Sequence, residues 1–164
     1  MADFLPDNYT VPNESNYSKL QKGDNKFRIM GSPLLGWEDW TADKKPVRYP
    51  MNGKPEHSIN PEKPIKHFWA MPVWDYQMNK VTILEITQKS IQNAVGALAK
   101  NADWGDPRNY DITITRAGDG MQTEYSVTPI PPKKLPKEIT DAFGAATINL
   151  EALFDGGDPF KLPF

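Results

Sequence analysis

Residues 66–87 read KHFWAMPVWDYQMNKVTILEIT. Aromatic and β-branched side chains dominate both halves of this stretch, and such side chains favour strands over helices. The short polar segment 77–79 separates the halves and is typical of a turn. The stretch therefore predicts an antiparallel hairpin in which residues 66–76 pair with residues 80–87.

The hydrophobic period changes after this hairpin. Apolar residues Ile91, Val95, Leu98 and Ala99 recur at helical spacing and form one stripe, with Thr87 or Ser90 as the expected N-cap. Trp104-Gly105-Asp106-Pro107 ends the helix. Alternating patterns then predict two more strands, at residues 110–116 and 123–128, joined by a turn at 117–120.

A bent strand is predicted before the hairpin. Residues 26–30 alternate in polarity, and Gly31, Pro33 and Gly36 interrupt the pattern before Trp37-Glu38-Asp39-Trp40. Glycine in a long first strand is how small barrels turn a corner. Residues 41–66 contain five prolines and show no hydrophobic period, so we expect one long loop there.

The predicted order is strand, strand, strand, helix, strand, strand. This order predicts an all-β protein, a five-stranded OB-fold Greek-key barrel with one helix between strands 3 and 4. A β-sandwich would need about seven strands. We expect a flexible arm at 1–18, the OB-fold domain at 19–131, and a linker, a short helix and a mildly acidic tail at 132–164.

Composition excludes several classes of function. The chain has 164 residues and no cysteine, which removes disulfides, thiolate metal sites and cysteine nucleophiles. It contains no apolar run of about 18 residues and no signal-peptide pattern, so we expect a cytoplasmic protein without membrane contact. His57 and His67 are ten residues apart, and adjacent Glu38 and Asp39 would point to opposite faces of a strand. We expect that the protein is not an enzyme and that it binds neither a cofactor nor a metal ion.

Charge and aromatic residues concentrate in one region. The net charge is −2, but residues 19–66 hold ten basic and six acidic side chains. Residues 37–76 contain seven aromatic side chains together with six of these cations. Proteins that bind single strands combine cations for phosphates with rings that stack on bases, whatever the sequence. The predicted DNA-binding residues are Arg28, Trp37, Trp40, Lys44, Lys45, Arg48, Tyr49, Lys63, Lys66, Trp69, Trp74, Tyr76, Arg116 and Tyr125.

Some of these rings have a second interpretation, because a tryptophan in a small barrel also serves as core. For Trp69 and Trp74 both readings stay open, and a bulge at Pro72 would break the alternation that assigns them to faces. Tyr125 and Arg116 could instead pair across neighbouring strands.

Several motifs resemble the single-stranded DNA-binding proteins of tailed bacteriophages. They are KGDNKFRI (22–29), GWEDW (36–40), KHFWA (66–70) and WGDP (104–107), in this order along the chain. The resemblance implies an OB-fold that coats single-stranded DNA in phage replication and recombination, in the cytoplasm of an infected bacterium. Some members carry a zinc site, which the absence of cysteine disfavours here.

The resemblance also implies a C-terminal tail that contacts replication or recombination proteins. Two glycines and two prolines in residues 155–164 predict that this segment leaves the barrel as a flexible tail. Its phenylalanines either fold back onto the barrel or dock in a partner. The predicted partner-binding residues are Asp155, Asp158, Pro163 and Phe164.

Two other functions remain open at this stage. One is an OB-like module for RNA or a glycan, since sugars also stack on tryptophan. The other is a non-catalytic phage structural or adaptor protein whose rings are all core. Salt separates DNA from glycan, because only phosphate binding weakens steeply as salt rises.

Overall fold

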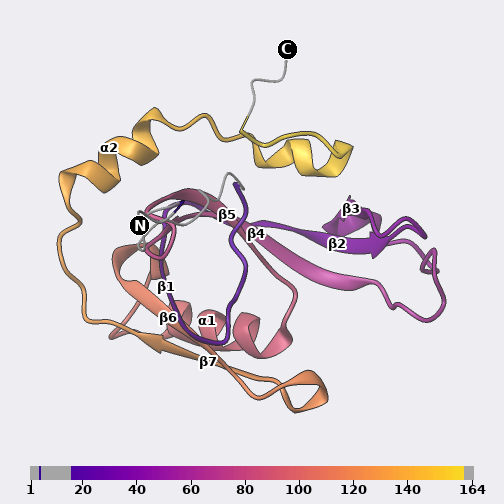
Figure 1. The fold of residues 1–164 in the computed structure, drawn as a ribbon, viewed down its shortest axis with the longest axis horizontal. Coiled ribbons are helices and arrows are strands. Elements are labelled where there is room, and N and C mark those ends of the chain that lie inside the picture. The colour runs from indigo at the N-terminus through magenta and orange to yellow at the C-terminus, as the bar shows by residue number, and fades with distance from the viewer. Residues whose placement is uncertain (1–3, 5–15, 161–164) are drawn as a thin grey trace.

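The computed structural model describes Phe4 and residues 16–160. Strands predominate; one α-helix and three short 3-10 turns connect them, and a second α-helix and a fourth 3-10 turn follow the last strand (Figure 1). The strands are β1 (Gly23–Ile29), β2 (Leu34–Trp40), β3 (Pro46–Pro50), β4 (Lys66–Asp75), β5 (Lys80–Ile86), β6 (Asp111–Ala117) and β7 (Glu124–Pro129). The helices are α1 (Lys89–Lys100) and α2 (Lys137–Ala145), and the 3-10 turns are η1 (Met51–Gly53), η2 (Pro107–Asn109), η3 (Gly120–Gln122) and η4 (Leu150–Asp155).

The seven strands form one antiparallel sheet in the order β3-β2-β4-β1-β6-β7, and β5 pairs with the other edge of β4. The β4–β5 hairpin is confirmed in unbroken register from Trp69↔Ile86 to Asp75↔Lys80. The prediction of a mostly β protein is confirmed, but the described strands form an open seven-stranded sheet and do not close into a five-stranded barrel. Within residues 16–160 no ladder joins β5 to β7, and α1 contacts β7 instead, so the sheet stays open.

The first predicted strand is two strands, β1 and β2, separated by a bend. Between the pairs Ile29↔Val73 and Leu34↔Ala70 this chain advances five residues whereas β4 advances three. The two extra residues of this chain therefore lie within residues 30–33, opposite Pro72. Pro72 itself stays in register with β5. Since alternation along β4 is unbroken, odd-numbered and even-numbered side chains of β4 point to opposite faces.

The prediction that residues 41–66 form one loop is wrong, because this stretch contains β3 and η1. Pro46 and Pro50 stand at the two ends of β3, which is an edge strand, and proline is tolerated there. A side chain at Gly36 would collide with the carbonyl oxygen of Tyr49 and the ring of Phe68. Glycine at this position lets β2 and β3 pair closely.

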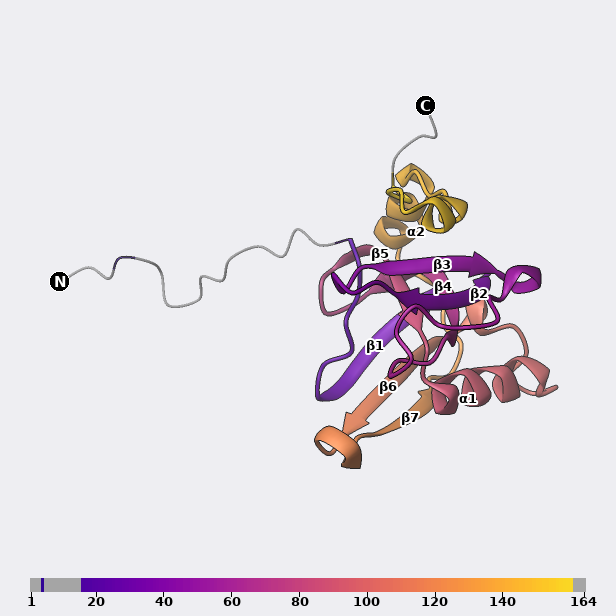
Figure 2. The same ribbon diagram turned by 90° about the vertical axis from the view of Figure 1, so that its right-hand side faces the viewer.

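Two apolar clusters lie on the two faces of β4. The larger cluster joins Met71 and Val73 to β1, β5, β6 and the stripe Ile91 and Val95 of α1. The smaller one joins Phe68 and Ala70 to Leu153 of the C-terminal segment. In Figure 2, α1 lies below the β2–β4 layer and the C-terminal segment lies above it. The helix predicted after the hairpin is confirmed, although its N-cap is Gln88 without a side-chain bond, and neither Thr87 nor Ser90 caps it.

Both ends of the described chain lie against the sheet. Ser18 N donates to Ile83 O and Ile83 N donates to Asn16 O, each at 2.9 Å, so residues 16–18 of the expected arm run beside β5. The rest of the arm, apart from Phe4, lies outside the described residues.

The expectation of a free tail fails for residues 155–160, because Phe160 packs on the smaller apolar cluster and Asn149 N donates to Pro159 O at 2.6 Å. Of the two readings for the tail phenylalanines, folding back is confirmed for Phe160. Asp155 and Asp158 are exposed, and Pro163 and Phe164 lie outside the described residues.

Candidate nucleic-acid interface

Three rings lie side by side across three neighbouring strands. Trp37 of β2 stands opposite Tyr49 of β3 and opposite His67 of β4. The Trp37 and His67 ring centroids are 5.2 Å apart with the planes tilted by 53°. Trp69 continues the line, since its Nε1 donates to His67 Nε2 at 3.2 Å. We call Tyr49, Trp37, His67 and Trp69 the aromatic row.

The aromatic row extends the core face of β4 beyond the core. Trp69 shares its face with Met71 and Val73, which are buried, whereas all four rings of the row are half-buried. β2 and β3 project past the end of α1 (Figure 1), which accounts for the partial exposure of this face. Rings that are held in place and partly open to solvent suit the stacking of a flat ligand.

A cation sits directly over the row. Lys54 Nζ lies 4.5 Å from the centroid of the Trp37 ring, a cation–π distance. The segment after β3 is fastened to the same ring, because Trp37 Nε1 donates to Met51 O at 3.0 Å. Lys44 and Lys45 are exposed in the turn between β2 and β3. Positive charge therefore borders the aromatic row on the β2–β3 side.

Trp40 points to the other face of β2. It lies three positions after Trp37, and successive side chains of a regular strand alternate between the two faces. It lines a shallow cavity of about 360 Å³ together with Glu62, Lys63 and Lys66. The structure thus divides the predicted DNA-binding residues of this region between two faces. Trp37, Tyr49 and Trp69 lie on one, and Trp40, Lys63 and Lys66 lie together on a separate surface.

Two predicted DNA-binding residues, Arg28 and Trp74, are buried, and a third, Arg48, is half-buried in an ion pair, so the structure argues against these three assignments. Arg28 is 3% exposed and its Nε donates to Asp111 at 2.8 Å. Arg48 Nη2 is 2.7 Å from Glu85, and its side chain is 12% exposed. Trp74 is 8% exposed. Both guanidinium groups are held in ion pairs with carboxylates, so they stabilise the fold and are not presented to phosphates.

Three others lie away from the row. Tyr76 follows the far end of β4, about 30 Å along the strand from His67 at the usual strand rise. Its hydroxyl donates to Asp111 at 2.9 Å, and burial together with that bond raises its pKa to about 12. Arg116 Nη1 donates to Leu20 O at 3.1 Å, and Tyr125 packs on the larger apolar cluster. The structure therefore does not bring them together with the row.

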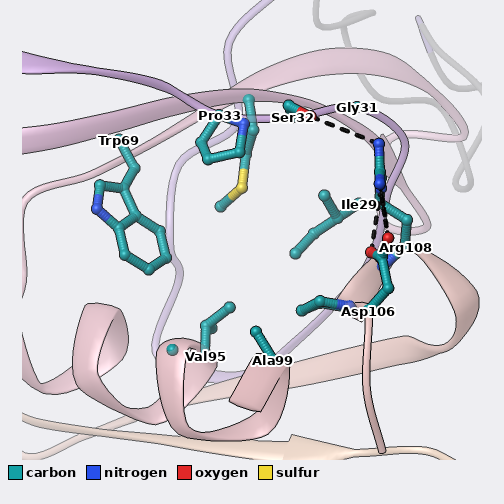
Figure 3. A pocket seen from close by; sticks show the side chains of 12 residues that line it. Ile29, Gly31, Ser32, Pro33, Trp69, Val95, Ala99, Asp106 and Arg108 are labelled. Atoms are coloured by element: carbon teal, nitrogen blue, oxygen red, sulfur yellow. Dashed lines mark hydrogen bonds and ion pairs between the residues drawn. The ribbon is translucent and has the colours of Figure 1, made fainter.

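A cavity of about 420 Å³ adjoins the row at Trp69 (Figure 3). Opposite Trp69 stand Asp106 and Arg108, whose Oδ2 and Nη2 are 2.6 Å apart. That guanidinium holds the pKa of Asp106 below its usual value. Sequence reasoning missed this cavity, and it missed His67 as a member of the row. The cavity and the row both depend on which residues face each other across neighbouring β-strands. The sequence pattern within one β-strand does not carry that information.

A buried carboxylate lies on the opposite face of the same strands. Glu38 is 2% exposed, 3.3 Å from Arg48 Nε, and close to Glu85. Burial and the neighbouring Glu85 carboxylate raise the pKa of Glu38 to about 8, against the lowering effect of Arg48. Near neutral pH the folded protein therefore keeps a proton on Glu38.

This proton predicts how stability depends on pH. In the unfolded chain Glu38 releases the proton near pH 4.5, whereas the folded protein keeps it up to about pH 8. The stabilisation is complete below pH 4.5 and is lost as pH rises to about 8, at up to about 1.4 kcal/mol per pH unit. Urea unfolding of Glu38→Gln at pH 5, 7 and 9 should give a flatter profile than the parent. Glu62→Gln, an exposed control, should keep the parental slope; equal slopes in all three proteins would contradict this assignment.

Comparison of the chain with protein-family models, curated proteins and solved structures finds no match. In residues 16–160, no helix has the length and apolar character to cross a membrane. Nor does that part of the chain gather three His, Asp or Glu side chains into a group that could hold a metal ion. The function must therefore be argued from the geometry of the interface itself.

Proposed function

We propose that this protein binds single-stranded DNA without sequence preference, along the aromatic row. The observation that carries the proposal is the alignment of Tyr49, Trp37 and His67 on three adjacent strands, with Lys54 over the central ring. Unpaired bases stack on such rings, each contributing about 1–3 kcal/mol, and every base has a flat face. Cations beside the rings neutralise the phosphates between successive bases.

The connectivity supports an OB-type arrangement. If β1 and β2 count as one bent strand, it pairs with both β4 and β6, and α1 follows β5 before β6 and β7. These are the pairings of an OB barrel left open between its third and fifth strands, with β3 inserted in the loop after the first. OB-folds bind single strands through their second and third strands and this same loop. The row lies on the β2 half of the first strand, on β3 in that loop, and on β4, the second strand of the proposed barrel.

The biological role proposed is the coating of single-stranded DNA in phage replication or recombination, in the cytoplasm of the infected host. The motifs that resemble phage single-stranded DNA-binding proteins support it, because Trp37, His67 and Trp69 all lie within them. Contacts with replication proteins through the chain end belong to the same proposal, and exposed Asp155 and Asp158 offer the acidic charge for them.

Tryptophan fluorescence titrated with oligo-dT at two salt concentrations tests the proposal. Binding should quench the emission of Trp37 and Trp69, and affinity should fall steeply as salt rises, since phosphate contacts release counterions. Absence of quenching and of any mobility shift at low salt would refute it. Binding that ignores salt would indicate a glycan-type ligand instead.

The lysines of the β2–β3 turn should set part of that salt dependence. We expect Lys44→Ala with Lys45→Ala to flatten the slope of log affinity against log salt by up to about 1.4, or about 0.7 for each phosphate contact on a single strand. The matched control is Lys133→Ala with Lys134→Ala, another exposed pair outside the row. A slope unchanged in the first variant, or changed equally in both, would remove the turn from the binding surface.

A further inference from the structure

We infer that the cavity beside Trp69 is a pocket for one nucleobase of the bound strand. The inference rests on the proposed function and adds a second mode of contact to it. Its volume of about 420 Å³ lies within the roughly 300–1,000 Å³ of small-ligand pockets. A base that leaves the row at Trp69 would enter this space directly.

The walls suit a flat, largely apolar ring. Trp69 stands on one side of the cavity, Val95 and Ala99 of α1 line its floor, and Ile29 lies on the side of Arg108 (Figure 3). Such a pocket, closed by an indole ring, offers stacking on one side and dispersion contacts on the other. Because Trp69 also belongs to the aromatic row, successive nucleotides could occupy the row and the pocket without a break.

The opposite wall carries the polar groups that a base edge requires. Asp106 accepts hydrogen bonds from Nε and Nη2 of Arg108 at 2.6–3.0 Å, whereas Nη1 has, among the described residues, only a long 3.4 Å contact with Ser32 Oγ. The side chain of Arg108 is 50% exposed and that of Asp106 is 40% exposed. A half-exposed donor fork beside a carboxylate can pair with both the acceptors and the amino groups of bases. A hydrocarbon ligand would displace water from this ion pair and offer no polar atom to Nη1 in return, so the pair favours a ligand with a polar edge, such as a base.

Gly96 allows the pocket to be filled without disturbing the fold. It lines the cavity from α1, and a Cβ built there meets no atom within 4 Å. A larger side chain would therefore enter the cavity, and replacing glycine inside a helix favours the helix. Gly144 of α2 is a matched control, since a Cβ there also meets open space and α2 does not line the cavity.

The experiment compares Gly96→Phe with Gly144→Phe in oligo-dT binding and in thermal unfolding. Gly96→Phe should bind about 5- to 150-fold more weakly, the equivalent of one stacked base, at an unchanged or higher melting temperature. Gly144→Phe should bind like the parent. Thymidine monophosphate alone should shift the amide resonances of residue 96 and Ala99 in the parent. It should not shift the resonances of these two positions in Gly96→Phe.

A second test uses oligo-dT with one abasic residue placed at each position in turn, in the parent and in Gly96→Phe. The loss of one base should cost most affinity at a single position, and Gly96→Phe should abolish that position's distinction. Equal affinity of Gly96→Phe and parent, alongside weakened binding by Trp37→Ala, would overturn the pocket and leave the row intact. Equal losses in the Gly96 and Gly144 variants would also overturn it. Failure of the parent to bind oligo-dT would overturn the proposed function, and the pocket with it.

Discussion

Asp111→Ala should lower the free energy of unfolding by about 3–5 kcal/mol, a large part of the stability of a single domain. Asp111 is 1% exposed and accepts hydrogen bonds from Arg28 Nε at 2.8 Å and from the Tyr76 hydroxyl at 2.9 Å. Arg28 is itself 3% exposed. Removal of the carboxylate would leave a buried guanidinium without a counter-charge, and its desolvation would no longer be offset.

Urea unfolding at fixed pH measures this loss, with Asp119→Ala as control. Asp119 is paired with Lys22 at 3.3 Å, but both side chains are exposed, so we expect a change below about 1 kcal/mol. The double variant Arg28→Met with Asp111→Leu should be more stable than Asp111→Ala, because it removes both buried charges. A loss under about 1 kcal/mol in Asp111→Ala would show that the Arg28 charge finds water or another partner.

The elements predicted from the sequence are those that local patterns define. The β4–β5 hairpin follows from an aromatic-rich run and a β-branched run on the two sides of a polar turn, and α1 follows from a four-residue apolar stripe. The sequence did not predict β3 because proline lacks a backbone N–H. It therefore argues against any strand that must pair with a neighbouring strand on each side. An edge strand needs pairing on one side only, and nothing local shows that β3 lies at an edge.

The candidate interface was predictable in composition but not in arrangement. Arg28 and Arg48 look like surface cations until their partners Asp111 and Glu85, 83 and 37 residues away, are placed beside them. By contrast, strand alternation alone would have separated Trp37 from Trp40. The alignment of Tyr49, Trp37 and His67 depends on register between strands, and turns and core packing set that register together.

The proposed function predicts its largest change of affinity for Trp37→Ala combined with Tyr49→Ala. Removing two neighbouring rings should weaken oligo-dT binding by about 30- to 1,000-fold, since each lost stacking contact is worth about 1–3 kcal/mol and neighbouring losses are not fully additive. The salt slope should remain parental, because the lysines that contact phosphate are untouched. This combination of lower affinity and equal slope distinguishes stacking from charge.

Trp40→Ala is the matched control for this prediction, because Trp40 is a half-buried tryptophan of the same strand that points to the opposite face. Binding by this variant should stay within about threefold of the parent, a change of less than about 0.7 kcal/mol. Thermal unfolding of all three proteins separates lost stacking from lost folding. If Trp40→Ala weakens binding as much as the double variant does, the bound DNA contacts both faces of β2. Parental affinity in the double variant would mean that the aromatic row does not bind DNA.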